Sequence, residues 1–80
     1  MKDTKSIIYE EKSIVLIYET IIESNSYGIK ITELQNDKII DNAVVKDIAV
    51  SEDRINYIFD LIVRNTVTPC TIYEILSDIL

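Results

Sequence analysis

Cys70 is the only thiol of the chain and lies beside its only proline in the stretch TVTPCTIYEIL, residues 66–76. A cysteine at the start of a helix is a candidate nucleophile or redox group. Such chemistry also needs a base or an orienting group, and the sequence contains no histidine. We therefore expect no catalytic role for Cys70, and alkylation at neutral pH no faster than that of a free cysteine.

The fourteen acidic residues are not spaced to act together. Pairs such as Glu10-Glu11 and Glu52-Asp53 are adjacent, so on a strand they point to opposite faces and on a helix they diverge by about 100°. No segment matches a calcium loop, and one cysteine without histidine argues against a disulfide or a conventional zinc site. We expect no catalytic, cofactor-binding or metal-binding residues, no cofactor, and no enzymatic activity.

Gly28 and the five tyrosines have structural interpretations. Gly28 is the only glycine, so it cannot belong to a glycine-rich phosphate loop. Inside a strand, a lone glycine indicates a bulge or the close approach of another backbone. Each tyrosine lies within an apolar pattern, which favours packing in the core or at an interface.

The proline and cysteine also fit the start of a helix. Thr68 is placed to be the N-cap, where its hydroxyl can accept a backbone N–H. Pro69 then falls at the first helical position, where its missing N–H costs nothing. Val67 and Ile72 have the spacing of a hydrophobic staple. We interpret this stretch as a helix start.

A second helix start precedes it, in VSEDRI. Ser51 is the expected N-cap, and Val50 and Ile55 are the expected staple. Apolar residues at helical spacing follow both starts, so residues 51–80 are predicted to form a helical hairpin.

The first half of the chain reads as strands. Residues 13–48 are rich in β-branched and alternating apolar residues, interrupted near Ser24-Asn25-Ser26 and at Asn36-Asp37. These interruptions predict an antiparallel meander, in which a loop of two or of three residues at Asn36-Asp37 would set a different register. Residues 1–12 are expected to form an N-terminal arm or a short strand.

Composition limits the partners. Eighty residues make a single domain, residues 1–80, and the net charge of −6 lacks the basic surface that nucleic acids or anionic membranes require. No apolar run is long enough to cross a bilayer. We expect a cytoplasmic protein with no nucleic-acid, membrane or small-molecule partner.

The first long strand has more apolar surface than one helical layer can cover. One face carries Ile14, Leu16, Tyr18 and Ile22, and the other carries Val15, Ile17 and Ile21. Either the N-terminal arm covers the second face, or a second copy or another protein does; we favour the intermolecular contact. Tyr57 and Leu61, one helical turn apart, form a lesser patch. These five residues are the predicted interface.

Four short motifs carry a resemblance to a known family: YGI, VKDIAVSED, VTP and ILSDIL, at residues 27–29, 45–53, 67–69 and 75–80. They resemble a domain-of-unknown-function family of short proteins from low-GC, often spore-forming Gram-positive bacteria. The resemblance covers residues 27–80, and residues 1–26 carry little of it. It implies a small bacterial cytoplasmic protein and assigns no activity to any residue.

Together these observations predict an α+β fold, with a three-stranded or four-stranded antiparallel meander followed by a C-terminal helical hairpin packed on one face. The predicted function is a non-enzymatic protein-interaction or regulatory module that binds a protein partner or itself, with a homodimer favoured. The alternative is an acidic decoy that occupies a nucleic-acid-binding site on another protein.

Overall fold

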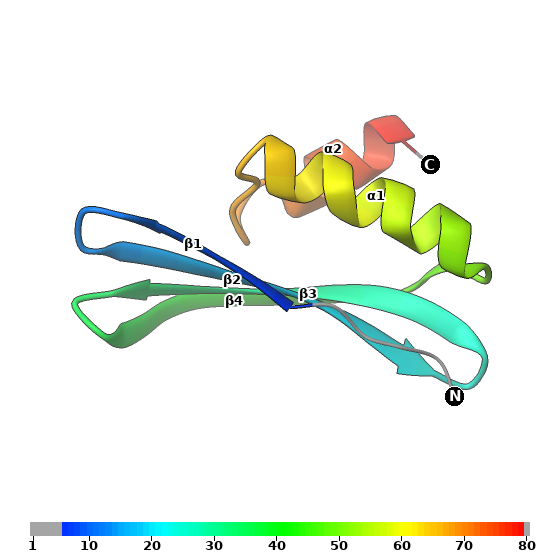
Figure 1. Ribbon diagram of the computed structural model, residues 1–80, viewed down its shortest axis with the longest axis horizontal. Coiled ribbons are helices and arrows are strands. Elements are labelled where there is room, and N and C mark those ends of the chain that lie inside the picture. The colour runs from blue at the N-terminus through cyan, green and yellow to red at the C-terminus, as the bar shows by residue number, and fades with distance from the viewer. Residues whose placement is uncertain (1–5, 80) are drawn as a thin grey trace.

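The computed structural model describes residues 6–79, which form a four-stranded antiparallel sheet and two helices. The elements are β1 (Ser6–Glu11), β2 (Ile14–Glu23), β3 (Ser26–Gln35), β4 (Lys38–Ala49), α1 (Glu52–Arg64) and α2 (Ile72–Ile79). Both helices lie on the same side of the sheet (Figure 1). This arrangement confirms the predicted α+β class, in its four-stranded form.

The strands follow one another in the order β1-β2-β3-β4, and each connection is a two-residue turn. Both residues of Ser24-Asn25 and of Asn36-Asp37 have positive φ, as a type I′ turn requires. Asparagine tolerates this conformation better than most residues. The connection between β3 and β4 is therefore the shorter of the two alternatives that the sequence allowed.

The N-terminal strand does not cover the second face of β2. β1 pairs edge to edge with β2, from Ser6 opposite Glu19 to Glu11 opposite Ile14. Backbone pairing places it in the plane of the sheet rather than across it. Residues 1–5 of the predicted arm lie outside the described part of the chain.

A bulge of three residues in β4 lies opposite Gly28. Tyr27 pairs with Ala49 and Ile29 with Val45, so residues 46–48 of β4 face one residue of β3. A Cβ atom at Gly28 would overlap the carbonyl oxygen of Val45. The structure thus confirms both a bulge and a close backbone approach at this glycine.

The core lies between the helices and the middle strands. From the sheet it receives the buried side chains of Leu16, Tyr18, Tyr27, Ile29 and Ile31, and from the helices those of Ile55, Ile58, Phe59, Ile62, Ile72 and Leu76. On β2 the buried residues alternate with half-buried ones, because only alternate side chains point toward the helices.

The first helix begins as predicted at its cap but not at its staple. The Ser51 hydroxyl accepts a hydrogen bond from the Arg54 backbone N–H at 3.2 Å. Val50, however, is 79% exposed, so it does not pack on the buried Ile55. The preceding residue, Ala49, already occupies the core-facing position at the end of β4, which leaves Val50 directed to solvent.

The second helix start differs in detail from the prediction. The Thr68 carbonyl accepts the Ile72 N–H at 3.1 Å, so the first turn begins at Thr68. The side-chain acceptor is the hydroxyl of Thr71, which takes the Thr68 backbone N–H at 3.2 Å, while the Thr68 hydroxyl contacts that of Thr71. Val67 and Ile72 are both buried, consistent with the predicted staple.

Candidate functional site

The side of the sheet that faces away from the helices is the candidate site, and we call it the outer face. Residues paired directly across antiparallel strands share a face. The pairing therefore places Ile8, Ile17, Thr32 and Asn42 in one row across all four strands. The next row contains Glu10, Val15, Leu34 and Ile39. The outer face is thus a continuous surface that all four strands build.

The centre of the outer face is apolar. Its aliphatic members are Ile8, Val15, Ile17, Ile21, Leu34, Ile39 and Val44. Ile8 and Ile39 are 64% and 65% exposed. Val15, Ile17 and Ile21 are half-buried, because neighbouring strands flank them while no described segment covers them.

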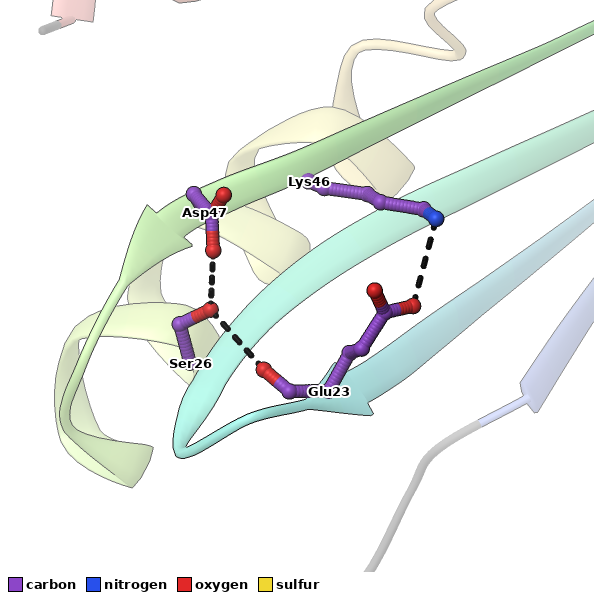
Figure 2. A network of polar contacts seen from close by, with 4 residues as sticks. All are labelled: Glu23, Ser26, Lys46 and Asp47. Atoms are coloured by element: carbon purple, nitrogen blue, oxygen red, sulfur yellow. Dashed lines mark hydrogen bonds and ion pairs between the residues drawn. The ribbon is translucent and has the colours of Figure 1, made fainter.

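Polar residues border this apolar surface at the end nearest the β2–β3 turn (Figure 2). Lys46 Nζ lies 3.2 Å from Glu23 Oε2. The Ser26 hydroxyl lies within hydrogen-bond distance of the Glu23 carbonyl oxygen, at 3.1 Å, and of the Asp47 carboxylate. Its one hydrogen can be donated to either acceptor. These contacts join the β2–β3 turn to the bulge of β4, where Asp47 has a φ of 58°.

One pair of opposite charges interrupts the aliphatic rows. Glu19 on β2 is directly opposite Lys30 on β3, and both side chains are on the outer face. Cross-strand neighbours of opposite charge stabilise a sheet modestly. They also give the face a local pattern of charge that a docking surface would have to match.

The five residues of the predicted interface lie on two different surfaces. Val15, Ile17 and Ile21 lie together on the outer face. Tyr57 and Leu61 are on α1, on the helical side of the sheet. The Arg54 guanidinium lies over the Tyr57 ring, 5.5 Å from its centroid, so this ring already has a cationic neighbour.

Sequence reasoning missed the outer-face members contributed by the other strands: Ile8, Leu34, Ile39 and Val44. The alternation along each strand separates its two faces but does not say which face lies toward the helices. A two-residue turn at Asn36-Asp37 would have placed Leu34 and Ile39 opposite each other. That turn length was the signal available in the sequence.

A hollow of about 330 Å³ opens on the helical side, between the β1–β2 turn and the connection from α1 to α2. Ile14 and Leu16 supply apolar lining, and Glu11 and Glu33 supply carboxylates. The Tyr9 hydroxyl donates to Glu11 Oε2 at 2.7 Å, and this hydrogen bond to a carboxylate raises the pKa of Tyr9. A phenol is protonated at neutral pH even with its ordinary pKa, so Tyr9 is unsuited to act as a base there.

Other chemistry-bearing groups do not assemble into a site. Cys70 is free and exposed. Within residues 6–79, no three cysteine or acidic side chains come together in a way that could hold a metal ion. In the described part of the chain, neither helix is long and apolar enough to cross a bilayer.

Residues 3–80 match a family model described as a family of unknown function (DUF6514). The chain belongs to this family. The DUF6514 match begins before β1, so it also covers the first two strands, which the sequence resemblance had largely left out. No curated protein and no solved structure matches the chain.

Proposed function

We propose that this DUF6514 chain is a non-enzymatic protein-interaction module, and that its outer face docks on the outer face of a second copy. The observation that carries this proposal is the patch of uncovered aliphatic side chains on two neighbouring rows, with Ile8 on β1, Val15 and Ile17 on β2, Leu34 on β3 and Ile39 on β4. Monomeric proteins rarely expose an apolar patch that extends across a whole sheet. Burial of such a patch is favourable by roughly 25 cal/mol for each Å².

The size of the face supports an interface between proteins. Strands of six, ten, ten and twelve residues, spaced about 4.8 Å apart with about 3.3 Å per residue, present roughly 600 Å². A stable interface of standard size takes about 800 Å² from each partner. The outer face is therefore close to that size but somewhat smaller.

A second copy is the partner that best fits the chemistry of the face. A two-fold axis brings the same patch together from both copies, so the aliphatic centre meets an aliphatic centre. The outer face also carries both Glu19 and Lys30, so each charge can meet its opposite in the other copy. Two sheets packed in this way cross at about 30° and form a sandwich with the helices outside.

Replacement of Ile17 by lysine tests the proposal. Ile17 lies in the middle of the outer face, on a strand with neighbours on both sides. An interface that buries this position would have to bury an unpaired charge. We expect Ile17→Lys to halve the mass of the native particle in sedimentation equilibrium.

The matched control is Val50→Lys, which adds the same charge at a highly exposed position outside the sheet. The control should leave the particle mass unchanged. A wild-type particle with the same mass as the folded Ile17→Lys variant would overturn the proposal. Circular dichroism must show that both variants keep the native secondary structure.

A further inference from the structure

The two edges of the sheet differ in how open they are to another strand. β1 forms one edge, and all six of its residues are exposed. Its sequence, SIIYEE, contains no proline, lysine or bulge, and its two charged residues, Glu10 and Glu11, lie together at the end next to the β1–β2 turn. Among the described residues, nothing pairs with its free side.

The opposite edge, on β4, is blocked. Register shifts interrupt the ladder near Ile40 and at residues 46–48, and bulges of this kind bend an edge away from a straight partner. Between them, the backbone N–H of Asn42 donates to the Asp41 carboxylate at 2.9 Å. This side chain occupies a donor that a docking strand would need.

The free side of β1 presents the backbone groups of alternate residues. The two-residue turn makes Glu11 and Ile14 a hydrogen-bonded pair. Because hydrogen-bonded and non-hydrogen-bonded pairs alternate, residues 7, 9 and 11 bond to β2. The N–H and C=O groups of Ser6, Ile8 and Glu10 therefore point outward, toward the open edge.

We propose that β1 pairs with β1 of a second copy, antiparallel and about a two-fold axis at Ile8, to form one continuous eight-stranded sheet. In this register Ile8 pairs with Ile8 of the other copy, and Ser6 pairs with Glu10 in both directions. Each hydrogen-bonded pair exchanges two bonds, so about six backbone hydrogen bonds form across the junction.

The side chains select the same register. With the axis at Ile8, the two isoleucines meet on the outer face, and Ile7 meets Tyr9 of the other copy on the helical face. Aromatic and β-branched residues are favourable cross-strand pairs. An axis at Tyr9 would instead place Ile8 opposite Glu10 and Ile7 opposite Glu11. An axis at Ile7 would use fewer of the outward backbone groups of residues 6–11.

This edge contact goes beyond the proposed stacking of outer faces and does not require it. The edge contact would join the outer faces of two copies into one docking surface of roughly 1,200 Å². Such a surface exceeds the roughly 800 Å² that a standard interface needs from each side. With both contacts present, the assembly is a tetramer with four times the 9.2 kDa mass of one chain.

The variant Ile8→Pro tests the edge contact. Proline removes the outward N–H of residue 8 but no bond to β2, because that N–H points away from β2. The matched control is Ile8→Ala, which shortens the same side chain and keeps the N–H. Both variants remove the isoleucine side chain from the outer face, so a loss of mass confined to Ile8→Pro comes from the missing N–H. We expect sedimentation equilibrium to give half the wild-type mass for Ile8→Pro and a higher mass for Ile8→Ala.

Parallel measurement of Ile17→Lys separates the two proposals. If only the edge contact exists, wild type is a dimer, Ile8→Pro is a monomer and Ile17→Lys stays a dimer. If only face stacking exists, Ile17→Lys is a monomer and Ile8→Pro has the same mass as Ile8→Ala, which overturns the edge contact.

Amide hydrogen exchange gives a second readout that needs no proline. In the Ile17→Lys variant, which lacks the stacked faces, the outward amides of Ile8 and Glu10 should be protected about as strongly as those of Ile7 and Tyr9. Rapid exchange at Ile8 and Glu10 alone, at a concentration where Ile17→Lys is fully folded, would overturn the edge contact.

Discussion

At the scale of single residues, Gly28 shows how one side chain can be excluded by the path of a neighbouring strand. Residues 46–48 of β4 fold closely over it, and a Cβ atom would also approach Lys46 Cα to 3.0 Å. The obstacle is the backbone of two adjacent β4 residues, which cannot turn away as a flexible side chain would. The bulge therefore depends on the absence of a side chain at this position.

We predict that Gly28→Ala lowers the free energy of unfolding by about 3 kcal/mol, because the added methyl group forces the bulge to move. Urea denaturation measures this change. Lys30→Ala, two residues along on the same face of β3, is the control and should change the stability by less than about 1 kcal/mol. Equal losses in the two variants would contradict the role assigned to the bulge.

The sequence predicted the backbone contact at Gly28 correctly but the environment of Val50 wrongly. A lone glycine in a strand has few physical explanations, so the close approach could be predicted. The exposure of Val50 could not be predicted. The hydrophobic-staple pattern requires the residue before the N-cap to face the core, and the sequence alone does not show which way it faces. Here the chain arrives from β4, whose last residue, Ala49, already fills the core-facing position.

At the scale of elements, Tyr18 connects the sheet to the helical layer. Its ring is fully buried on β2, and its hydroxyl donates to the Val67 carbonyl at 2.9 Å. Val67 follows the end of α1, where its own N–H donates to the Ile62 carbonyl at 3.1 Å. One side chain thus fixes the connection between the helices above the middle of β2.

We predict that Tyr18→Phe lowers the free energy of unfolding by about 1 to 2 kcal/mol at neutral pH, because the Val67 carbonyl loses a buried hydrogen bond. Chemical denaturation of both proteins measures the difference. A change near zero would contradict the role of this hydrogen bond.

The same variant should also change the dependence of stability on pH. Burial, with smaller contributions from Tyr9 and Glu33, raises the pKa of Tyr18 to about 12 from its ordinary value of 10.0. The folded state therefore keeps a proton that the unfolded state releases, so this contribution to stability is present below pH 10 and is lost as the pH rises toward 12. The difference in stability between wild type and Tyr18→Phe should shrink over that interval.

The elements themselves were largely readable from the sequence. Turn residues separate the strands, the cap at Ser51 locates the start of α1, and the motif at Thr68 lies one turn before the start of α2. The composition of the outer face could not be read in the same way. It depends on which side of the sheet the helices cover, and on a register that changes within β4 at both bulges. Those features follow from packing between distant segments.

At the scale of the whole molecule, the chain is a thin two-layer structure with one layer of helices. Eighty residues bury a smaller fraction of their surface than a larger domain does, so additional burial has a large relative effect on stability. Association through the outer face would supply this burial. Stability and assembly should therefore be coupled.

We predict that the thermal midpoint of the wild-type protein rises with protein concentration, because subunits that associate only when folded stabilise the folded state by mass action. Scanning calorimetry over a hundredfold range of concentration measures this effect. The double variant Ile8→Pro/Ile17→Lys, which removes both proposed contacts, should unfold at one temperature throughout. A wild-type midpoint independent of concentration would contradict the coupling.

The bulged edge of β4 limits how many copies could join edge to edge in one sheet. A sheet that could accept neighbours on both sides would add copies without limit and grow into a fibre. Here the bulges and the Asp41 carboxylate block the β4 edge, and pairing of β1 with β1 of a second copy would occupy the other edge. Growth along the sheet would then stop at a pair, and the exposed edge strand would not lead to amyloid.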